Sequence, residues 1–229
     1  HLLLDLNPDA PAFAHDLAAA LPFDGRNPIY SVLHESCWAD GIATDLRTYG
    51  LVTGDRVSSW LSSRAESVAL LFACSREGFV YNPSLHHSHT CAEVGTLMQW
   101  VTPRALIAEE GWGADRKTAN LDKILTEVPS LKVVYDVEYM PAAAPNLTPW
   151  HTDPDSVSYM AFTSMSSGEP KLVMHSDNTL LSNARELVRD WQLKDSATVL
   201  PLSPLSHHVG WVAVAQWLIA GCRLALNDP

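Results

Sequence analysis

The sequence is short of cysteine, of positive charge and of long apolar runs. Its four cysteines, at positions 37, 74, 91 and 222, include no C-x-x-C pair, so neither a disulfide scaffold nor a cysteine-based zinc site is expected. Fifteen Lys and Arg residues stand against 26 Asp and Glu residues, which gives a net charge of −11. Without a run of basic residues, the chain lacks the electrostatic signature of a protein that binds nucleic acid or anionic lipid. We therefore expect neither partner.

The lack of long apolar runs also argues against a membrane protein. The longest run, Val212–Cys222, is interrupted by Gln216 and is shorter than the ~18 residues that a spanning helix needs. The opening run Leu2–Leu4 has no basic flank and is shorter than the apolar core of a signal peptide, about 7 residues. We expect a cytoplasmic protein. Because the chain begins at His1 and ends directly after an apolar segment, we also expect it to be a piece of a longer one.

What the sequence does contain is an alternation of helix-like and strand-like segments in a chain that is 47% apolar. Such an alternation predicts an α/β fold of layered parallel sheets with flanking helices. Strands are expected at Arg56–Leu61, Phe79–Tyr81, Ala105–Ala108, Val133–Asp136, Val157–Thr163, Leu172–His175 and Thr198–Leu200. Helices are expected at His34–Tyr49, Ala65–Glu77, Thr90–Trp100, Asn120–Glu127, Asn178–Trp191 and Trp211–Ile219. The third of these helices begins with a T-x-x-E capping box at Thr90–Glu93.

Proline divides this pattern into two parts. Four prolines, at positions 141, 145, 149 and 154, exclude regular structure from that segment. We expect a first βα layer over residues 1–139, a linker over 140–156 and a second βα layer over 157–229.

A polar loop between two expected strands of the second layer is the most informative segment. Residues 163–171 contain four hydroxyl side chains, one glycine and one lysine within nine positions. Hydroxyls and backbone amides in a turn can surround phosphate oxygens, glycine allows close approach, and lysine adds a positive charge. An ordinary polar turn is the alternative, since Ser, Gly and Pro are common turn residues.

The loop resembles the phosphate-binding signature of the adenylate-forming superfamily, which includes acyl-CoA synthetases, peptide-synthetase adenylation domains and luciferases. The family pattern is T-S-G-T-T-G-x-P-K-G-V, and residues 163–173 read T-S-M-S-S-G-E-P-K-L-V. Other segments resemble further landmarks of the family, namely Gly50–Val57, Phe79–Pro83 and Pro204–Gly210. The resemblance runs from about Tyr30 to Pro229. The segment Asn82–Glu93 is most similar to ligases for cyclic or medium-chain carboxylic acids.

The resemblance implies the fold of an acyl-CoA synthetase N-terminal domain and the activity of an AMP-forming acid–thiol ligase. In that family ATP and a carboxylic acid form acyl-AMP and pyrophosphate, and the thiol of coenzyme A then displaces AMP. The implied ligands are ATP or acyl-AMP, coenzyme A and a small carboxylic acid, with Mg²⁺ bound through the nucleotide. A homodimer is left open. By position, the residues implied to hold the β- and γ-phosphates are Thr163, Ser164, Ser166, Ser167, Gly168 and Lys171.

His207 falls where the family places a residue beside the acyl pocket and the reacting carboxylate. The resemblance therefore implies His207 as a catalytic residue, and His207, His208 and Trp211 as the substrate pocket. A structural, hydrogen-bonded role remains open for both histidines, and a core position remains open for Trp211. The other tryptophans at apolar positions of expected elements are predicted to be core residues: Trp38, Trp60, Trp100, Trp191 and Trp217.

Two departures from the signature alter the expected activity. Met165 and Leu172 stand where the family has glycine, and a side chain there removes close approach and the freedom to adopt positive φ. We expect weakened adenylation, a retained thioester step and dependence on a partner enzyme that supplies acyl-AMP. The family's later adenine, ribose and catalytic lysine segments have no counterpart, so this piece alone is expected to be inactive. A non-catalytic binding or scaffolding relative is the alternative.

A histidine-rich segment completes the candidate sites. His86, His87, His89 and Cys91 could be drawn as a metal cluster, but no second ligand pair follows at zinc spacing. We favour a solvated loop and expect no metal bound by the protein itself.

Overall fold

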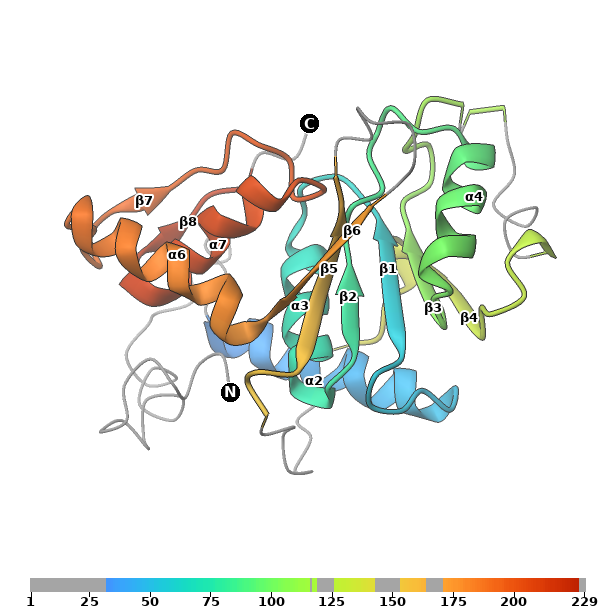
Figure 1. The fold of residues 1–229 in the computed structure, drawn as a ribbon, viewed down its shortest axis with the longest axis horizontal. Helices are drawn as coiled ribbons and strands as arrows, with labels where there is room; N and C mark the ends of the chain where they lie inside the picture. The colour runs from blue at the N-terminus through green and yellow to red at the C-terminus, as the bar shows by residue number, and fades with distance from the viewer. Residues whose placement is uncertain (1–31, 116, 119–125, 143–152, 164–170, 227–229) are drawn as a thin grey trace.

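The computed structural model describes residues 32–115, 117–118, 126–142, 153–163 and 171–226, with side chains from residue 38 onward (Figure 1). At the centre is a six-stranded sheet in the order β4-β3-β1-β2-β5-β6. The strands are β1 (Arg56–Trp60), β2 (Val80–Asn82), β3 (Ala105–Ala108), β4 (Val133–Asp136), β5 (Val157–Phe162) and β6 (Leu172–Ser176). All neighbouring pairs are parallel except β5 and β6, which are antiparallel. The predicted α/β class is confirmed.

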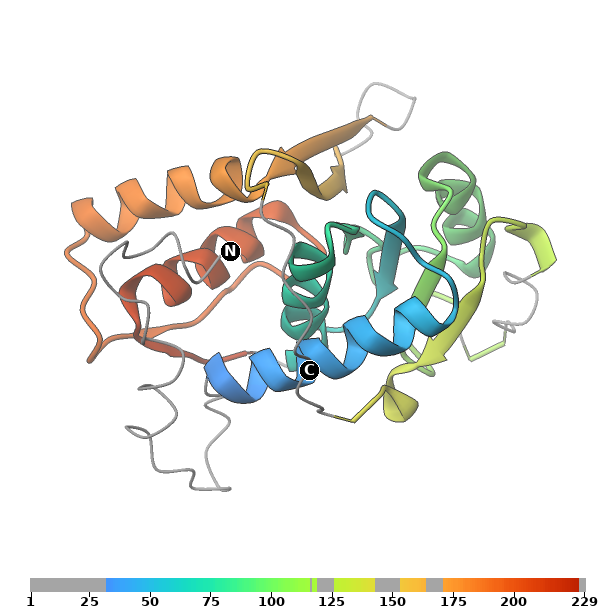
Figure 2. The same ribbon diagram turned by 90° about the horizontal axis from the view of Figure 1, so that it is seen from below.

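Helices cover both faces of this sheet (Figure 2). The helices α2 (Val32–Thr48) and α3 (Ala65–Glu77) lie on one face, and α4 (Cys91–Val101) lies on the other. Successive strand side chains point to opposite faces, so Ile107 joins the core beneath α3 while Leu106 joins the core beneath α4. Burial on both faces explains why β3 consists only of apolar residues.

The start of α4 confirms the predicted capping box. The backbone N–H of Glu93 donates to the Thr90 hydroxyl, and the backbone N–H of Thr90 donates to the Glu93 carboxylate at 2.8 Å. The end of α3 at Gly78 also agrees with the sequence, since Gly78 has a φ of 69°, which favours glycine. Of the helix predicted over Asn120–Glu127, all but the last two residues lie outside the described ranges.

A C-terminal unit packs beside the sheet. It contains α6 (Asp177–Asp190), α7 (His208–Ala220) and a small parallel sheet of β7 (Thr198–Val199) and β8 (Arg223–Leu224). Helix α7 begins at His208, three residues before the predicted start at Trp211. The difference arises because Gly210 suggests a turn, whereas here it lies in the first turn of the helix, where α7 approaches the preceding loop closely.

The two expected layers share one sheet. Strand β5 follows the proline-rich segment and pairs with β2, and the start of α6 is tied to the same layers through Asp177. Its carboxylate accepts hydrogen bonds from Ser75 on α3, at 2.6 Å, and from Ser158 on β5. Most of the expected linker lies outside the described ranges, and the boundaries at 140 and 156 stay a prediction.

The tryptophan prediction is partly wrong. Trp60 and Trp217 are buried, and Trp38 is partly buried against the core. Trp100 and Trp191, however, are 55% and 62% exposed. Trp100 lies beside the buried stripe of α4 and not within it, and Trp191 caps the C-terminal end of α6. Among the described residues, no helix combines the length and apolarity needed to cross a bilayer.

Candidate functional site

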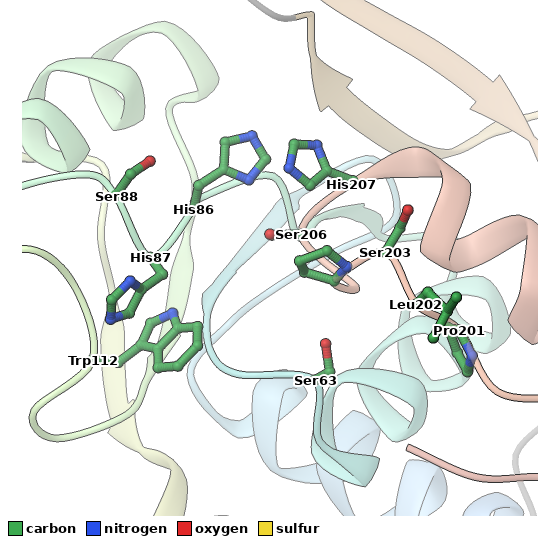
Figure 3. A pocket seen from close by; sticks show the side chains of 11 residues that line it. Ser63, His86, His87, Ser88, Trp112, Pro201, Leu202, Ser203, Ser206 and His207 are labelled. Atoms are coloured by element: carbon green, nitrogen blue, oxygen red, sulfur yellow. The ribbon is translucent and has the colours of Figure 1, made fainter. Parts of the chain in front are cut away.

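A pocket of about 330 Å³ opens where β1, β2 and β3 end (Figure 3). We call the residues that follow these strands the strand-side wall: Ser63, His86, His87, Ser88 and Trp112. We call the loop before α7 the helix-side wall: Pro201, Leu202, Ser203, Pro204, Ser206 and His207. Strands β1 and β3 are neighbours in the sheet. The connection from β1 leads to β2, toward one edge of the sheet, whereas the connection from β3 leads to β4, toward the opposite edge. Ligand sites in open α/β sheets form at the carboxyl ends of strands where the connections diverge in this way.

Buried and partly buried hydrogen bonds hold the strand-side wall in place. The carbonyl of His86 accepts from Trp60 Nε1 at 3.0 Å, and its backbone N–H donates to Nδ1 of His89 at 3.1 Å. Asn82 is fully buried; it donates to Ser58 at 3.2 Å and accepts from the Ser84 hydroxyl at 2.6 Å. The loop after β2 is therefore anchored to the sheet at its start, through Asn82, and in its middle, through His86.

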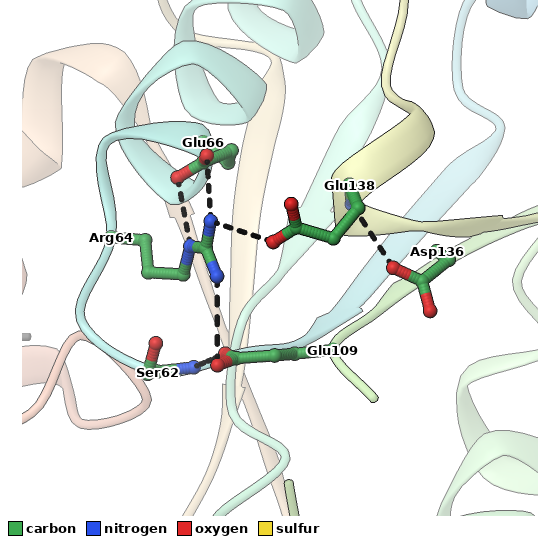
Figure 4. A network of polar contacts seen from close by, with 6 residues as sticks. All are labelled: Ser62, Arg64, Glu66, Glu109, Asp136 and Glu138. Carbon is green, nitrogen blue, oxygen red and sulfur yellow. Dashed lines mark hydrogen bonds and ion pairs between the residues drawn. The ribbon is translucent and has the colours of Figure 1, made fainter. Parts of the chain in front are cut away.

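The loop that carries Ser63 is fixed by an arginine (Figure 4). The Arg64 guanidinium lies within hydrogen-bond or ion-pair distance of three carboxylates, those of Glu66, Glu109 and Glu138. Glu109 also accepts the backbone N–H of Ser62 at 2.9 Å. Because Glu109 follows β3 directly, this network joins the ends of β1 and β3 beside the pocket.

The helix-side wall depends on close backbone contact. A Cβ atom on Gly210 would lie 2.5 Å from the carbonyl oxygen of Pro204, so only glycine lets the first turn of α7 approach the wall so closely. Leu205 connects this wall to its neighbours, because its N–H donates to the Ser63 hydroxyl at 3.1 Å and its carbonyl accepts from Trp211 Nε1.

Two imidazole rings meet across the pocket. His86 and His207 are stacked, with ring centroids 4.1 Å apart and planes inclined by 23° (Figure 3). Burial, together with the neighbouring His207 and His89, lowers the pKa of His86 to about 4. His86 is therefore uncharged at neutral pH.

The interpretation of 86–89 as a solvated loop is only partly right. His87 is exposed and packs edge-on against Trp112, with ring centroids 4.5 Å apart. His89 is only 8% exposed, so for this residue the interpretation is wrong. Within the described ranges, no group of three or more His, Cys, Asp or Glu side chains could hold a metal ion.

Of the three residues implied for the substrate pocket, only His207 lines the pocket described above. His207 is exposed, caps α7 through its backbone and lines the pocket. His208 and Trp211 do not line this pocket. His208 stacks on His175 at 4.6 Å, and its pKa is lowered by burial and by His175. Trp211 is 2% exposed and packs edge-on against Tyr81, which is a core position.

Most of the phosphate loop lies outside the described ranges, including Ser164, Met165, Ser166, Ser167 and Gly168. Its two flanking residues are described. The N–H of Thr163 donates to the carbonyl of Lys171 at 2.9 Å, so the ends of the loop are held together where β5 and β6 meet. Leu172 pairs with Phe162 across these strands and packs against the apolar cluster beneath α4.

Sequence reasoning considered His86 and His87 only as part of a metal cluster and missed their place in the strand-side wall. Ser63 and His86 lie within four residues of the ends of β1 and β2, and the rule for carboxyl ends of strands would have selected both. Nothing local in the sequence indicates that His86 meets His207, since their contact depends on the tertiary fold.

Comparison with known proteins supplies the family. The family model described as AMP-binding enzyme matches residues 6–229. "Protein Y" of Streptomyces griseus is 28% identical, with 83% of this chain and 67% of that protein covered. The acetyl-coenzyme A synthetase of Bartonella bacilliformis is 22% identical (87% and 34% covered), and the medium-chain fatty-acid–CoA ligase of Escherichia coli is 24% identical (93% and 40% covered). The chain thus spans between about a third and two thirds of these relatives.

Solved structures agree in fold. Apo MatB from Rhodopseudomonas palustris superposes with a TM-score of 0.72 at 23% identity, covering 86% of this chain and 39% of that one. VinN superposes with a TM-score of 0.70 at 19% identity, covering 99% and 59%. At such identities the likeness shows the fold alone. The family match over nearly all of the sequence shows more: this chain belongs to the AMP-binding enzyme family, the adenylate-forming superfamily that its phosphate loop resembles.

Proposed function

We propose that this chain is part of an AMP-forming carboxylate–CoA ligase. A carboxylic acid reacts with ATP to give acyl-AMP and pyrophosphate, and the thiol of coenzyme A then displaces AMP to give the thioester. The observation that carries the proposal is the position of His207. In the family this residue lies beside the reacting carboxylate, and here it lines the pocket at the carboxyl ends of β1, β2 and β3.

The phosphate loop would bind the nucleotide. Its proposed ligands for the β- and γ-phosphates are Thr163, Ser164, Ser166, Ser167, Gly168 and Lys171. A carboxylate that approaches a polyphosphate is repelled unless donors and positive charges are already in place. The hydrogen bond between Thr163 and Lys171 supports this role, because it brings the two ends of the loop together.

Mg²⁺ enters the proposal only as an ion carried by the nucleotide. When bound, it would offset the negative charge of the phosphates. The described side chains offer no cluster of three or more ligands that could hold a metal. Because ATP and coenzyme A are cytoplasmic metabolites, we place the enzyme in the cytoplasm.

The substrate is proposed to be a small carboxylic acid. Relatives are named as acetyl-coenzyme A synthetases and as a medium-chain fatty-acid–CoA ligase, and the segment Asn82–Glu93 resembles ligases for cyclic or medium-chain acids. The direct test is to incubate the full-length protein with ATP, Mg²⁺, coenzyme A and a panel of short, medium-chain and cyclic acids. Mass spectrometry should detect AMP and one acyl-CoA series. Absence of any thioester from every acid and from every preformed acyl-AMP would refute the proposal.

We further propose that adenylation is weaker than thioester formation, and that a partner enzyme supplies acyl-AMP. Leu172 packs against apolar side chains in the sheet, so crowding of the phosphates is assigned to Met165. Replacement of Met165 by glycine should raise ATP–pyrophosphate exchange at least tenfold, because each charge-assisted hydrogen bond regained contributes about 1.5–3 kcal/mol. Leu172→Gly is the matched control, which should lower the melting temperature and leave exchange no faster. Exchange in the unmodified protein as fast as its thioester formation would contradict this assignment.

A non-catalytic relative is the second candidate, and the Met165 departure is the feature that favours it. Calorimetry of the full-length protein with ATP, AMP and a non-hydrolysable acyl-AMP mimic separates the two. A scaffolding protein with a decayed loop should bind none of them. The ligase should bind the acyl-AMP mimic more tightly than ATP.

A further inference from the structure

The contact between His86 and His207 joins the two walls of the pocket. His86 belongs to the strand-side wall and His207 to the helix-side wall, and their positions in the sequence are far apart. Their rings are nevertheless stacked, with centroids 4.1 Å apart and planes inclined by 23°, and Figure 3 shows them next to each other at the pocket. Through this contact, a side chain on one wall can restrict the orientation of a side chain on the other.

His86 is the fixed member of this pair. Its carbonyl accepts from Trp60 Nε1, and Trp60 has no exposed surface. Its N–H donates to Nδ1 of His89, which is itself buried. The backbone of His86 is therefore held on both sides, by Trp60 of the core beneath α4 and by the buried His89.

The contact made by His86 is through the face of its ring. Its Nδ1 atom is buried and has no hydrogen-bond partner within the described parts of the chain. Burial and the two neighbouring imidazoles keep its pKa low, at about 4, so the ring is neutral at the pH at which such an enzyme works. A neutral flat ring whose buried nitrogen makes no hydrogen bond to the described residues can be replaced by a phenyl ring of similar shape.

His207 differs from His86 in that its side chain is exposed, although its backbone is also fixed. Its backbone is fixed, because its N–H donates to Pro204 at 2.9 Å and its carbonyl accepts from Gly210 at 3.0 Å. Its side chain is exposed and makes no capping hydrogen bond to α7. An exposed imidazole retains several rotamers unless a neighbour selects one. The face of His86 is the neighbour in position to do so.

We propose that His86 is a positioning residue that holds the imidazole of His207 in one orientation at the pocket. The inference rests on the proposed function, in which His207 lies beside the reacting carboxylate. It adds a residue that lies outside both the phosphate loop and the Pro204–Gly210 segment. A misplacement of about 1 Å at a reacting group can reduce a rate by ~10²-fold, so loss of the stack should slow the reaction without abolishing substrate binding.

The kinetic test uses four variants of the full-length protein: His86→Ala, His86→Phe, His207→Ala and the double variant His86→Ala/His207→Ala. The readout is acyl-CoA formation from a preformed acyl-AMP and coenzyme A. His86→Ala should lower kcat roughly tenfold or more while KM for acyl-AMP changes less, and His86→Phe should restore kcat. In the His207→Ala background the His86 substitution should have no further effect on kcat, because residues that act through one another are non-additive. An equal loss in both backgrounds, or no rescue by phenylalanine in a variant that melts normally, would overturn the inference.

A second readout does not depend on activity. In NMR spectra of histidine-labelled protein, the ring resonance of His207 is assigned by its disappearance in His207→Ala. Ring stacking should displace this resonance from the position of free histidine in the unmodified protein and in His86→Phe, and His86→Ala should return it toward that position. A resonance unmoved by His86→Ala would contradict the stack. If no thioester forms with the unmodified protein, the proposed function fails, and the NMR result still decides whether His86 positions His207.

Discussion

The two walls of the pocket are fixed by different kinds of contact. The strand-side wall follows strand ends and is held by buried side-chain hydrogen bonds, of which those of Asn82 are the most enclosed. The helix-side wall is held by backbone contact, which the missing side chain of Gly210 makes possible. The strand-side wall should therefore be destabilised when a polar group is removed, and the helix-side wall when a single methyl group is added.

The largest effect is expected at the helix-side wall. Gly210→Ala would place a Cβ atom 2.5 Å from the Pro204 carbonyl oxygen and 2.9 Å from that of Ser203. Since both atoms belong to the backbone, the loop must move, and we expect a loss of about 3 kcal/mol in the free energy of unfolding. Urea unfolding measures this value, and the variant should also lose thioester formation.

Gly95 provides the matched control. It lies inside α4, and a Cβ atom there would meet a flexible Glu127 side chain at 3.5 Å. Gly95→Ala should therefore stabilise the protein by about 0.5–1 kcal/mol through helix propensity. Equal destabilisation by both substitutions would show that the close approach at Gly210 is not the cause.

The strand-side wall should respond to the loss of Asn82. In Asn82→Ala the hydroxyls of Ser58 and Ser84 lose a buried partner, and we expect a loss of about 2 kcal/mol. Asn178→Ala removes an amide whose hydrogen bond to Asp155 is exposed, and it should change stability by less than about 0.5 kcal/mol. Similar values for the two asparagines in urea unfolding would count against buried polar anchoring of this wall.

The smallest effect concerns pH and the contact between the walls. His86 has a pKa of about 4 in the folded protein against an ordinary value of 6.5, so between these pH values the unfolded chain binds more protons. The free energy of unfolding therefore falls as pH drops from 6.5 toward 4. His86→Phe removes this dependence and should be about 1 kcal/mol more stable than the unmodified protein near pH 5, after allowance for partial exposure. The gain should vanish at pH 7, and a gain that is equal at both pH values would contradict a neutral, desolvated His86.

Local sequence signals predicted much of the frame of the site. The capping box at Thr90 fixed the start of α4, and the apolar tetrapeptide at 105–108 gave β3 with its observed bounds. These signals succeed because caps and buried strands depend on near neighbours in the chain. The start of α7 was predicted late, because the role of Gly210 depends on Pro204 approaching it in three dimensions.

The candidate site was predicted in one respect and missed in another. Motif spacing singled out His207, which lines the pocket, whereas Trp211 from the same segment is a core residue. Leu172 was expected to crowd the phosphates; strand pairing places it opposite Phe162, its side chain packs against the apolar cluster beneath α4, and its effect on adenylation stays a prediction. Contacts such as that of His86 with His207 depend on how loops meet across the sheet and have no local signal.

One measurement tests whether the proposed ligase reaction takes place in the pocket between the two walls. Preformed acyl-adenylates of several chain lengths are mixed with coenzyme A and the full-length protein, unmodified or with His207→Ala, and acyl-CoA and AMP are followed with time. We expect stoichiometric acyl-CoA and AMP from the unmodified protein, and a rate at least tenfold lower for a His207→Ala variant of unchanged melting temperature. Thioester formation at the full rate without the His207 imidazole, or none from the unmodified protein, would contradict this expectation.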